Sequence, residues 1–280
     1  MKKIVLLALV VLLVLTSIVV PTMAEELNPT HIVGHLTESN MSEDNIDVFL
    51  QERFEAGWVV FDENHASHFE YYDDLSSLLL ALNAGTVDEI TLPRFVAEYV
   101  VKNNPELQIC CVQSMPDDMT LHFGFLDDEK GNDLRTRVNE AIAAMKGDGT
   151  LDALTTQYLK PGAGEMLMLV QFESFPESDE TVRVAVTGDL PPIDYIGEDG
   201  IPAGFNTAVL AEVGRRLGVN IELVSMQAGS RALALTSGTA DAVFWFMWSP
   251  TVNNDTPEGL VFSDSYLSWD MWLHINKAEK

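Results

Sequence analysis

The side chains of this sequence that suit metal binding or reaction chemistry fall into two small groups. The first holds His65 and His68, which are separated by two residues, with three acids close by: Asp62, Glu63 and Glu70. Two histidines at this spacing share a metal ion only when further ligands join them, and the polar surroundings indicate an exposed loop instead. We therefore expect no metal site and no cofactor.

The second group is the adjacent pair Cys110 and Cys111, the only cysteines of the chain. Adjacent cysteines cannot close a loop, and a disulfide between them forms a strained ring. Their neighbours Leu107, Ile109 and Val112 predict a buried strand, in which cysteine acts as a small apolar residue. A redox role is the alternative.

The usual sequence motifs of enzymes are absent. The chain lacks Gly-x-Ser-x-Gly, a phosphate-binding P-loop and a complete Gly-x-Gly-x-x-Gly after a strand. No carboxylate stands out as placed for general acid work. We expect no catalytic residue, and a protein that binds instead of catalysing.

An aromatic run offers candidate contacts for a ligand. The residues from Phe244 to Trp248 alternate tryptophan with other large apolar side chains, as a strand buried on both faces also does. Trp248 stands at the end of this strand beside Ser249, where a cleft would open. Trp248 and Trp245 could stack on a ligand or attract a cation. Core packing is the competing interpretation.

Two arginines are candidates for an anionic ligand. Arg231 follows Gly229 and Ser230 at the predicted start of a helix, where a cation is unfavourable with respect to the helix dipole. Arg94 follows Pro93 in a similar position. A ligand carboxylate or phosphate would offset the unfavourable position, and so would an ion pair with a surface acid.

The elements that must position these residues alternate between strand and helix. Apolar runs bounded by turn residues predict strands, and stripes at helical spacing predict helices. Strands are expected at 31–34, 69–72, 87–92, 108–112, 122–126, 182–186, 221–224, 242–247 and 272–275, with helices at 46–54, 75–82, 95–102, 134–145, 151–158, 205–217 and 232–236. Residues 188–204 are expected to form a loop. The alternation predicts an α/β fold with parallel sheets.

The chain begins like an exported protein. Lys2 and Lys3 precede an apolar run, and Ala24 ends a stretch that signal peptidase would cleave, so residues 1–24 are expected to be a signal peptide. An uncleaved anchor is the alternative. The chain carries 43 acidic residues against 16 Lys and Arg, which argues against nucleic acid or an anionic membrane surface as a partner.

Motifs over most of residues 30–280 resemble the extracellular solute-binding proteins of the amino-acid-importer type, which serve ABC transporters. The second half resembles the opening of that family, in Val182-Arg-Val-Ala-Val186, Asp189-Leu-Pro-Pro-Ile-Asp-Tyr195, Arg216-Leu-Gly-Val219 and Phe262-Ser-Asp-Ser-Tyr266. The first half resembles its ending, in Tyr72-Asp-Asp-Leu75, Leu80-Ala-Leu-Asn-Ala-Gly85, Val138-Asn-Glu-Ala141 and Lys146-Gly-Asp-Gly-Thr150. The order of the two halves is therefore reversed, which predicts a circular permutation.

The resemblance implies a two-lobed, type II periplasmic-binding-protein-like fold with the ligand cleft between the lobes. Residues 26–115 would form lobe 2, and residues 116–160 and 180–280 would form lobe 1. Residues 161–179 would be a linker between the permuted ends, and a hinge would lie near 114–120. The ligand would bind at the carboxyl ends of the strands, and closure of the lobes would trap it.

The resemblance also implies particular ligand contacts, and two contacts that are usual in the family are missing from this sequence. Tyr195 matches an aromatic residue that often caps the ligand, and Ser39 and Asn40 match a polar loop that faces the cleft. The arginine that the family places after a Thr-Pro pair is missing after Ser249 and Pro250. Pro93 stands where the family has an aspartate. The usual grip on a free amino acid is therefore incomplete.

The sequence predicts a monomeric, exported protein, periplasmic or extracellular, that captures a small polar or amino-acid-like solute for an ABC transporter permease. It would meet the membrane only through its signal segment or through docking to the permease. A sensor or interaction module that keeps the fold with a filled cleft is the first alternative. A dehydratase-like enzyme on the same fold is the second.

Overall fold

The structure is a computed structural model, which describes residues 31–37, 48, 67–160, 170–197, 200–248 and 258–278. Its helices are α2 (Leu75–Ala84), α3 (Arg94–Asn103), α4 (Glu129–Gly147), α5 (Thr150–Leu159), α6 (Phe205–Leu217), α7 (Arg231–Thr236) and the short 3-10 helix η2 (Ala228–Ser230). Its longer strands are β1 (His31–Leu36), β2 (Ser67–Tyr72), β3 (Glu89–Pro93), β4 (Leu107–Leu126), β5 (Thr181–Val186), β9 (Asn220–Ser225), β10 (Ala242–Trp248) and β12 (Leu267–Lys277). The shorter ones are β6 (Asp189–Leu190), β7 (Asp194–Ile196), β8 (Pro202–Ala203) and β11 (Leu260–Phe262). The predicted α/β class is confirmed.

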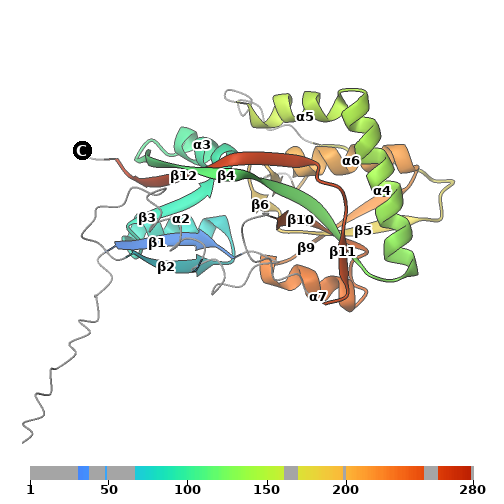
Figure 1. The fold of residues 1–280 in the computed structure, drawn as a ribbon, viewed down its shortest axis with the longest axis horizontal. Coiled ribbons are helices and arrows are strands. Elements are labelled where there is room, and N and C mark those ends of the chain that lie inside the picture. The colour runs from blue at the N-terminus through green and yellow to red at the C-terminus, as the bar shows by residue number, and fades with distance from the viewer. Residues whose placement is uncertain are drawn as a thin grey trace, which may run out of the picture.

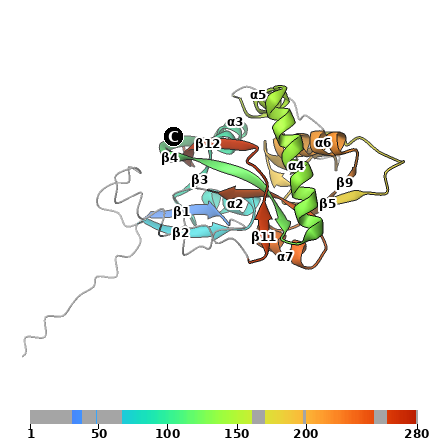
Figure 2. The same ribbon diagram turned by 45° about the vertical axis from the view of Figure 1, so that its right-hand side comes forward.

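One nine-stranded sheet runs through the molecule (Figure 1). Its strand order is β2-β1-β3-β12-β4-β10-β5-β9, and β11 pairs with β4. The strands β1, β2 and β3 are parallel neighbours on one side, packed by α2 and α3. The strands β5, β9 and β10 are parallel on the other side, packed by α6 and α7, and α4 packs against β4 and α6 (Figure 2). We call the first group lobe 2 and the second lobe 1.

Two long antiparallel strands cross between the lobes. The first half of β4 pairs with β12, where Leu107 lies opposite Lys277. The second half of β4 pairs with β10 and β11, while β12 also pairs with β3 in lobe 2. The segments on either side of the linker therefore share one sheet. The residues predicted as a hinge, 114–120, lie within β4.

The length of β4 corrects one prediction. The sequence patterns indicated separate strands at 108–112 and 122–126, but β4 is continuous from Leu107 to Leu126. The intervening residues lack a clear strand pattern, and β12 supplies hydrogen-bonding partners along both halves. The strand β12 likewise starts at Leu267, ahead of the predicted 272–275. The predicted helix at 46–54 lies outside the described residues except for Val48.

Local signals set the ends of α2, which extends two residues beyond the predicted 75–82. Asp74 accepts a hydrogen bond from the backbone N–H of Ser77 at 2.7 Å, which caps the first turn. Gly85 ends the helix with a φ of 77°, a conformation that glycine adopts without steric cost. The buried face includes Leu75, Leu78 and Leu82. Helix α2 thus starts at the gap between the lobes.

Residues 188–204 are not the simple loop that the sequence predicted. They hold a small antiparallel sheet in the order β6-β7-β8. Buried Asp194 holds its base, because its carboxylate accepts hydrogen bonds from Thr187 Oγ1 at 2.9 Å and from the Gly188 N–H at 3.1 Å. The many Pro, Gly and Asp residues hid these two- and three-residue strands from periodicity analysis.

The described part of the predicted linker packs on lobe 1 without a helix or strand. The Val170 N–H donates to the Pro202 carbonyl at 3.0 Å. The Phe175 N–H donates to Asn220 Oδ1 at 2.9 Å. This segment is therefore held along its length before β5 begins. None of the helices in the described ranges is long and apolar enough to cross a membrane.

Candidate functional site

The carboxyl ends of strands from the two lobes face each other across a crevice. One cavity in it, of about 400 Å³, is lined from lobe 2 by residues that follow β2 and from lobe 1 by residues that follow β5 and β9. We call it the acidic cavity; its lining is Asp73, Asp74, Ser76, Thr187, Asp189, Ser225, Met226 and Gln227. Parallel sheets place their binding sites at this edge, so the position agrees with the predicted cleft.

A hydrogen bond joins the lobes beside the acidic cavity. Asp189 Oδ2 of lobe 1 accepts from the Leu75 N–H of lobe 2 at 3.1 Å, at the first turn of α2. Burial raises the pKa of Asp189, the hydrogen bond from Leu75 opposes that rise, and the charge of Asp74 adds to it. A helix N-terminus favours a carboxylate. This hydrogen bond links the two lobes across the crevice.

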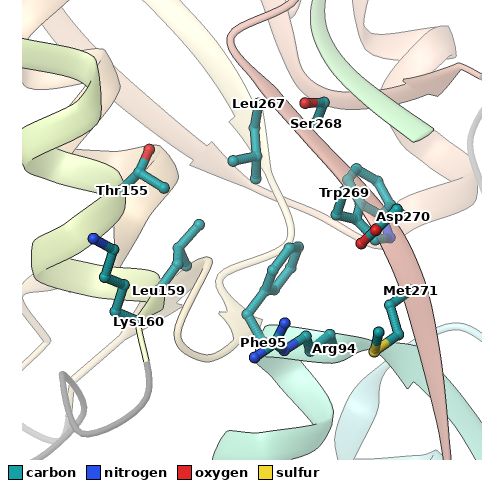
Figure 3. A pocket seen from close by; sticks show the side chains of 10 residues that line it. All are labelled: Arg94, Phe95, Thr155, Leu159, Lys160, Leu267, Ser268, Trp269, Asp270 and Met271. Carbon is teal, nitrogen blue, oxygen red and sulfur yellow. The ribbon is translucent and has the colours of Figure 1, made fainter. Parts of the chain in front are cut away.

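A second cavity, of about 430 Å³, lies between α3, α5 and the crossover strand β12 (Figure 3). We call it the Arg94 cavity. Its apolar lining is Phe95, Leu159, Leu267, Trp269 and Met271, and its polar lining is Arg94, Thr155, Lys160, Ser268 and Asp270. Binding sites for small molecules commonly combine an apolar wall with a few convergent polar groups.

The wall of the Arg94 cavity is aromatic. Trp269 and Phe95 meet edge to face, with ring centroids 5.7 Å apart. Both side chains are largely buried. Among the groups that the structure describes, none accepts a hydrogen bond from the buried Trp269 Nε1. A ligand acceptor in the cavity could satisfy this donor.

The charges at the rim of the Arg94 cavity are of both signs. Arg94 Nε lies 2.8 Å from Glu98 Oε1, and the Arg94 side chain is 46% exposed. Lys160 and the exposed Asp270 complete the charged lining. The arrangement can hold a carboxylate near Arg94 or Lys160 and an ammonium group near Asp270. Salt screens exposed charges of this kind, so they would contribute more to the choice of ligand than to the binding affinity.

The structure brings two predicted site residues to this region. Arg94 lines the cavity. Tyr195, in β7, lies close to Tyr99 of α3 and Tyr158 of α5; burial, and the charges that those tyrosines would carry, raise its pKa to about 12. Tyr195 is therefore half-buried between elements of both lobes.

The other predicted residues lie elsewhere or outside the described part. Trp248 is 41% exposed at the end of β10, and its carbonyl accepts from Thr120 Oγ1 at 3.1 Å. Arg231 is fully buried, and its guanidinium donates to the Phe244 carbonyl at 2.8 Å. Ser39, Asn40 and Ser249 lie outside the described residues, as does the side chain of Trp245.

Sequence reasoning missed several residues of the two cavities. Asp270 and Trp269 belong to the part of β12 that the strand prediction left out. Lys160 follows α5, and its sequence context indicated only the end of a helix. Asp189 stood inside a quoted family motif, which was an available signal. In the described part of the chain, side chains that could together hold a metal ion gather at one place, formed by Glu89, Cys110 and Cys111 in lobe 2.

The fold is two-lobed and of the α/β class, with a crevice between the lobes. Residues 182–279 match the model of the bacterial extracellular solute-binding proteins, family 3. This part of the chain is thus similar to the family, which confirms the resemblance that the motifs of the second half indicated. No curated protein matches the chain in sequence.

Several solved structures are similar at low identity. A zinc-bound ligand-binding component of an ABC-type import system from Staphylococcus aureus is 7% identical, with a TM-score of 0.47, over 88% of this chain and 65% of that one. An ancestral arginine-binding protein bound to arginine is 13% identical, with a TM-score of 0.40, over 91% and 87%. The probable amino-acid ABC transporter extracellular-binding protein ytmK from Bacillus subtilis is 11% identical, with a TM-score of 0.40, over 88% and 83%.

Proposed function

We propose that this protein is an exported solute-binding protein that captures a small amino-acid-like solute between its lobes. The observation that carries the proposal is the Arg94 cavity, which takes Arg94 and Phe95 from lobe 2, Leu159 and Lys160 from the end of lobe 1, and its floor from the crossover strand. A ligand there contacts both lobes at once. Its binding free energy therefore favours the closed arrangement over an open one.

The lining supports a ligand with separated charges and an apolar body. Arg94 and Lys160 suit a carboxylate, and Asp270 suits an amine. Phe95, Leu267 and other apolar side chains face the rest of the ligand. This grip replaces the arginine and aspartate that the family places elsewhere and that this sequence lacks.

Closure would occur about the two crossover strands. β4 and β12 are the long strands that join the lobes, and bending within them would separate the carboxyl ends of β2 and β5. The Asp189–Leu75 hydrogen bond would break on opening and form again on closure. Delivery to an ABC permease would use the surface that only the closed form presents.

The chain order supports the proposed circular permutation. The family match starts at residue 182, yet the earlier helices α4 and α5 complete lobe 1 by packing against α6. Residues 160–180 join these elements to β5. The proposed division keeps residues 1–24 as a signal peptide, 26–115 as lobe 2, 116–160 and 180–280 as lobe 1, and 161–179 as the linker.

A ligand screen tests the proposal. The purified protein is melted with each common amino acid, with simple carboxylic acids and with amines. A true ligand at a hundred times its Kd stabilises the native state by about 2.7 kcal/mol, and it is recovered unchanged.

Variants locate the site. Arg94→Ala and Asp270→Asn are expected to weaken binding of the best amino acid at least tenfold. Arg215→Ala is the matched control, because Arg215 also pairs on a helix surface, with Glu212 at 2.6 Å, away from the cavity. No stabilisation by any solute contradicts the proposal, as does equal binding by the Arg94 and Arg215 variants.

A further inference from the structure

A cluster of sulfur, nitrogen and oxygen ligand atoms lies inside lobe 2, away from the crevice. Four neighbouring strands contribute to it: His31 on β1, Glu89 on β3, His274 on β12, and the pair Cys110 and Cys111 on β4. His31 and Glu89 are the first residues of their strands, whereas the crevice lies at the carboxyl ends of the parallel strands. The cluster is thus at the opposite edge of the sheet from the two cavities.

A β-bulge explains how two adjacent cysteines face the same acid. In a regular strand, neighbouring side chains point to opposite faces. The register between β12 and β4 shifts here, since His274 lies opposite Cys111 while Ile275 lies opposite Ile109. Cys110 is the extra residue, and bulges of this kind redirect a side chain.

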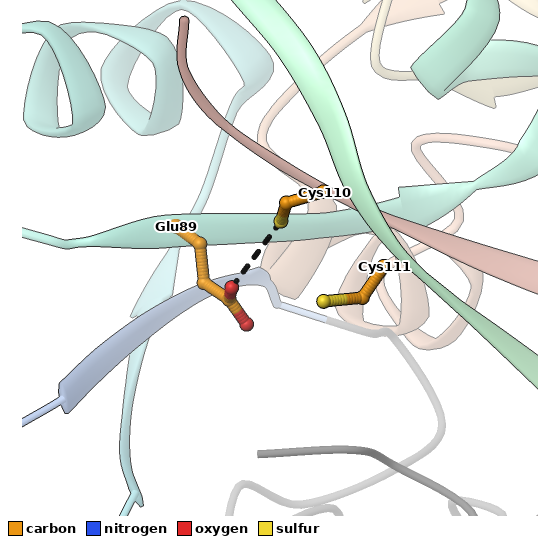
Figure 4. Close-up of side chains that lie close together, drawn as sticks. All are labelled: Glu89, Cys110 and Cys111. Atoms are coloured by element: carbon orange, nitrogen blue, oxygen red, sulfur yellow. Dashed lines mark hydrogen bonds between the residues drawn. The ribbon is translucent and has the colours of Figure 1, made fainter. Parts of the chain in front are cut away.

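The result is a compact set of ligand atoms (Figure 4). Cys110 Sγ lies 3.5 Å from Glu89 Oε2, and the two sulfurs and a carboxylate oxygen all lie within 4.8 Å of one another. His31 Nε2 lies 3.4 Å from the same Glu89 oxygen. Ligand atoms on one tetrahedral Zn²⁺, each about 2.0–2.3 Å from the ion, lie about 3.3–3.8 Å apart. The Cys110–Glu89 distance already falls in this range, and the two sulfurs and the carboxylate oxygen would have to approach one another by at most about 1.5 Å to share one ion.

We propose that Cys110, Cys111 and Glu89 form a binding site for Zn²⁺ or a metal ion of similar softness, with His31 beside Glu89 at the solvent side of the site. On binding, both thiols would lose their protons to solvent, so that two thiolates and one carboxylate bind the ion and a water molecule can take the fourth position. Thiolates select zinc-like ions over Mg²⁺ or Ca²⁺. His31, 28% exposed, gives the ion a path from solvent.

The groups around Glu89 hold its carboxylate in place. His274 Nδ1 donates to Glu89 Oε1 at 2.7 Å, which leaves the Oε2 side to Cys110 and His31. Metal-binding side chains are commonly held by such outer hydrogen bonds.

Neither simple packing nor redox chemistry explains the cluster as well. Cysteines that only filled space would not need a carboxylate that is 4% exposed beside them, because burying such a charge is costly. A redox-active cysteine needs a stabilised thiolate, whereas the Glu89 carboxylate, 3.5 Å from Cys110 Sγ, disfavours a second negative charge there. A metal ion supplies the positive charge that would turn the thiols into thiolates.

Cobalt titration of the reduced protein tests this proposal. Co²⁺ is expected to bind once per chain, with sulfur-to-cobalt charge-transfer absorption and the strong visible bands of a tetrahedral site. Zn²⁺ should displace it and raise the melting temperature. Bound Co²⁺ without charge-transfer absorption would overturn the proposal, and so would the absence of binding.

Variants complete the test. Cys110→Ser with Cys111→Ser, and Glu89→Gln, are expected to weaken Zn²⁺ binding at least a hundredfold, whereas His122→Gln in lobe 1 should leave it unchanged. If the double variant does not fold, Cys111→Ser alone should remove part of the charge-transfer absorption. Unchanged affinity in the cysteine or Glu89 variants refutes the site. Solute binding is measured separately with Zn²⁺ absent, so failure of either proposal is recognisable by itself.

Discussion

The two lobes place their charged groups differently. In lobe 1 the ion pairs join partly exposed arginines to carboxylates on other elements: Arg183 binds Asp241 at 3.0 Å, and Arg137 binds Glu180 at 2.6 Å. Inside lobe 1, the buried carboxylate of Asp194 accepts from a hydroxyl and from a backbone N–H. In lobe 2 the buried carboxylate of Glu89 faces the side chains of His274, His31 and Cys110. A buried acid thus anchors the backbone in lobe 1, whereas in lobe 2 it gathers side chains of the kinds that bind metal ions.

The cores of the two lobes also differ in their aromatic contacts. In lobe 1, Phe123 and Phe244 lie with ring centroids 4.9 Å apart, and Tyr266 is equally close to Phe123. Lobe 2 combines fully buried aliphatic residues such as Leu78 and Ile90 with Trp272, whose ring centroid lies 5.3 Å from that of His35. Because β4 and β12 contribute to both lobes, the two cores are expected to unfold together.

The largest effect is expected from the cores. Phe244→Ala should lower the free energy of unfolding by about 3–5 kcal/mol, and Leu78→Ala by about 2–5 kcal/mol, because each leaves a cavity. Urea denaturation should show one transition in both variants. Leu233→Ala, at a side chain that is 68% exposed, is the control. Two separate transitions would show that the lobes are independent, contrary to this account.

A smaller effect is expected from the ion pairs of lobe 1. Asp241 accepts from Arg183 Nε at 3.1 Å and from Lys130 Nζ at 2.6 Å. Asp241→Asn should lower the free energy of unfolding by about 1–2 kcal/mol at neutral pH. Asp133→Asn, which alters a more exposed pair with Arg137, should cost less than about 0.5 kcal/mol.

The pH dependence of the free energy of unfolding tests the role of Asp241 a second time. Burial raises the pKa of Asp241, but Arg183 and Lys130 outweigh it and lower the pKa to about 2. Its contribution is therefore complete above the ordinary carboxyl pKa and is lost as the pH falls towards 2. The difference between wild type and Asp241→Asn should shrink over that range. A constant difference would contradict this assignment.

Sequence reasoning captured the fold better than the site. Periodic helices such as α6, and β5 with its Val-Arg-Val-Ala-Val run, were predicted because their pattern is local. The middle of β4 and the start of β12 were missed, since pairing between distant segments makes them strands. The Arg94 cavity depends on that same pairing, so Trp269 and Asp270 could not be found from sequence.

The cysteine cluster shows the same limit. Adjacent cysteines in an apolar segment predicted buried packing, which is wrong: both cysteines are partly exposed, and Ile109 and Val112 are 40% and 53% exposed. Nothing local indicated a bulge. The bulge exists only in the register between β4 and β12. His31, Glu89 and His274 are far apart in the chain, and sheet order alone makes them neighbours of the cysteines.

Small-angle X-ray scattering, recorded with and without the best solute from the screen, tests the central claim most directly. Closure of two lobes about β4 and β12 predicts a smaller radius of gyration in the saturated protein, and Arg94→Ala should show no decrease at the same solute concentration. An unchanged radius in wild-type protein that calorimetry shows to be saturated would contradict capture between the lobes.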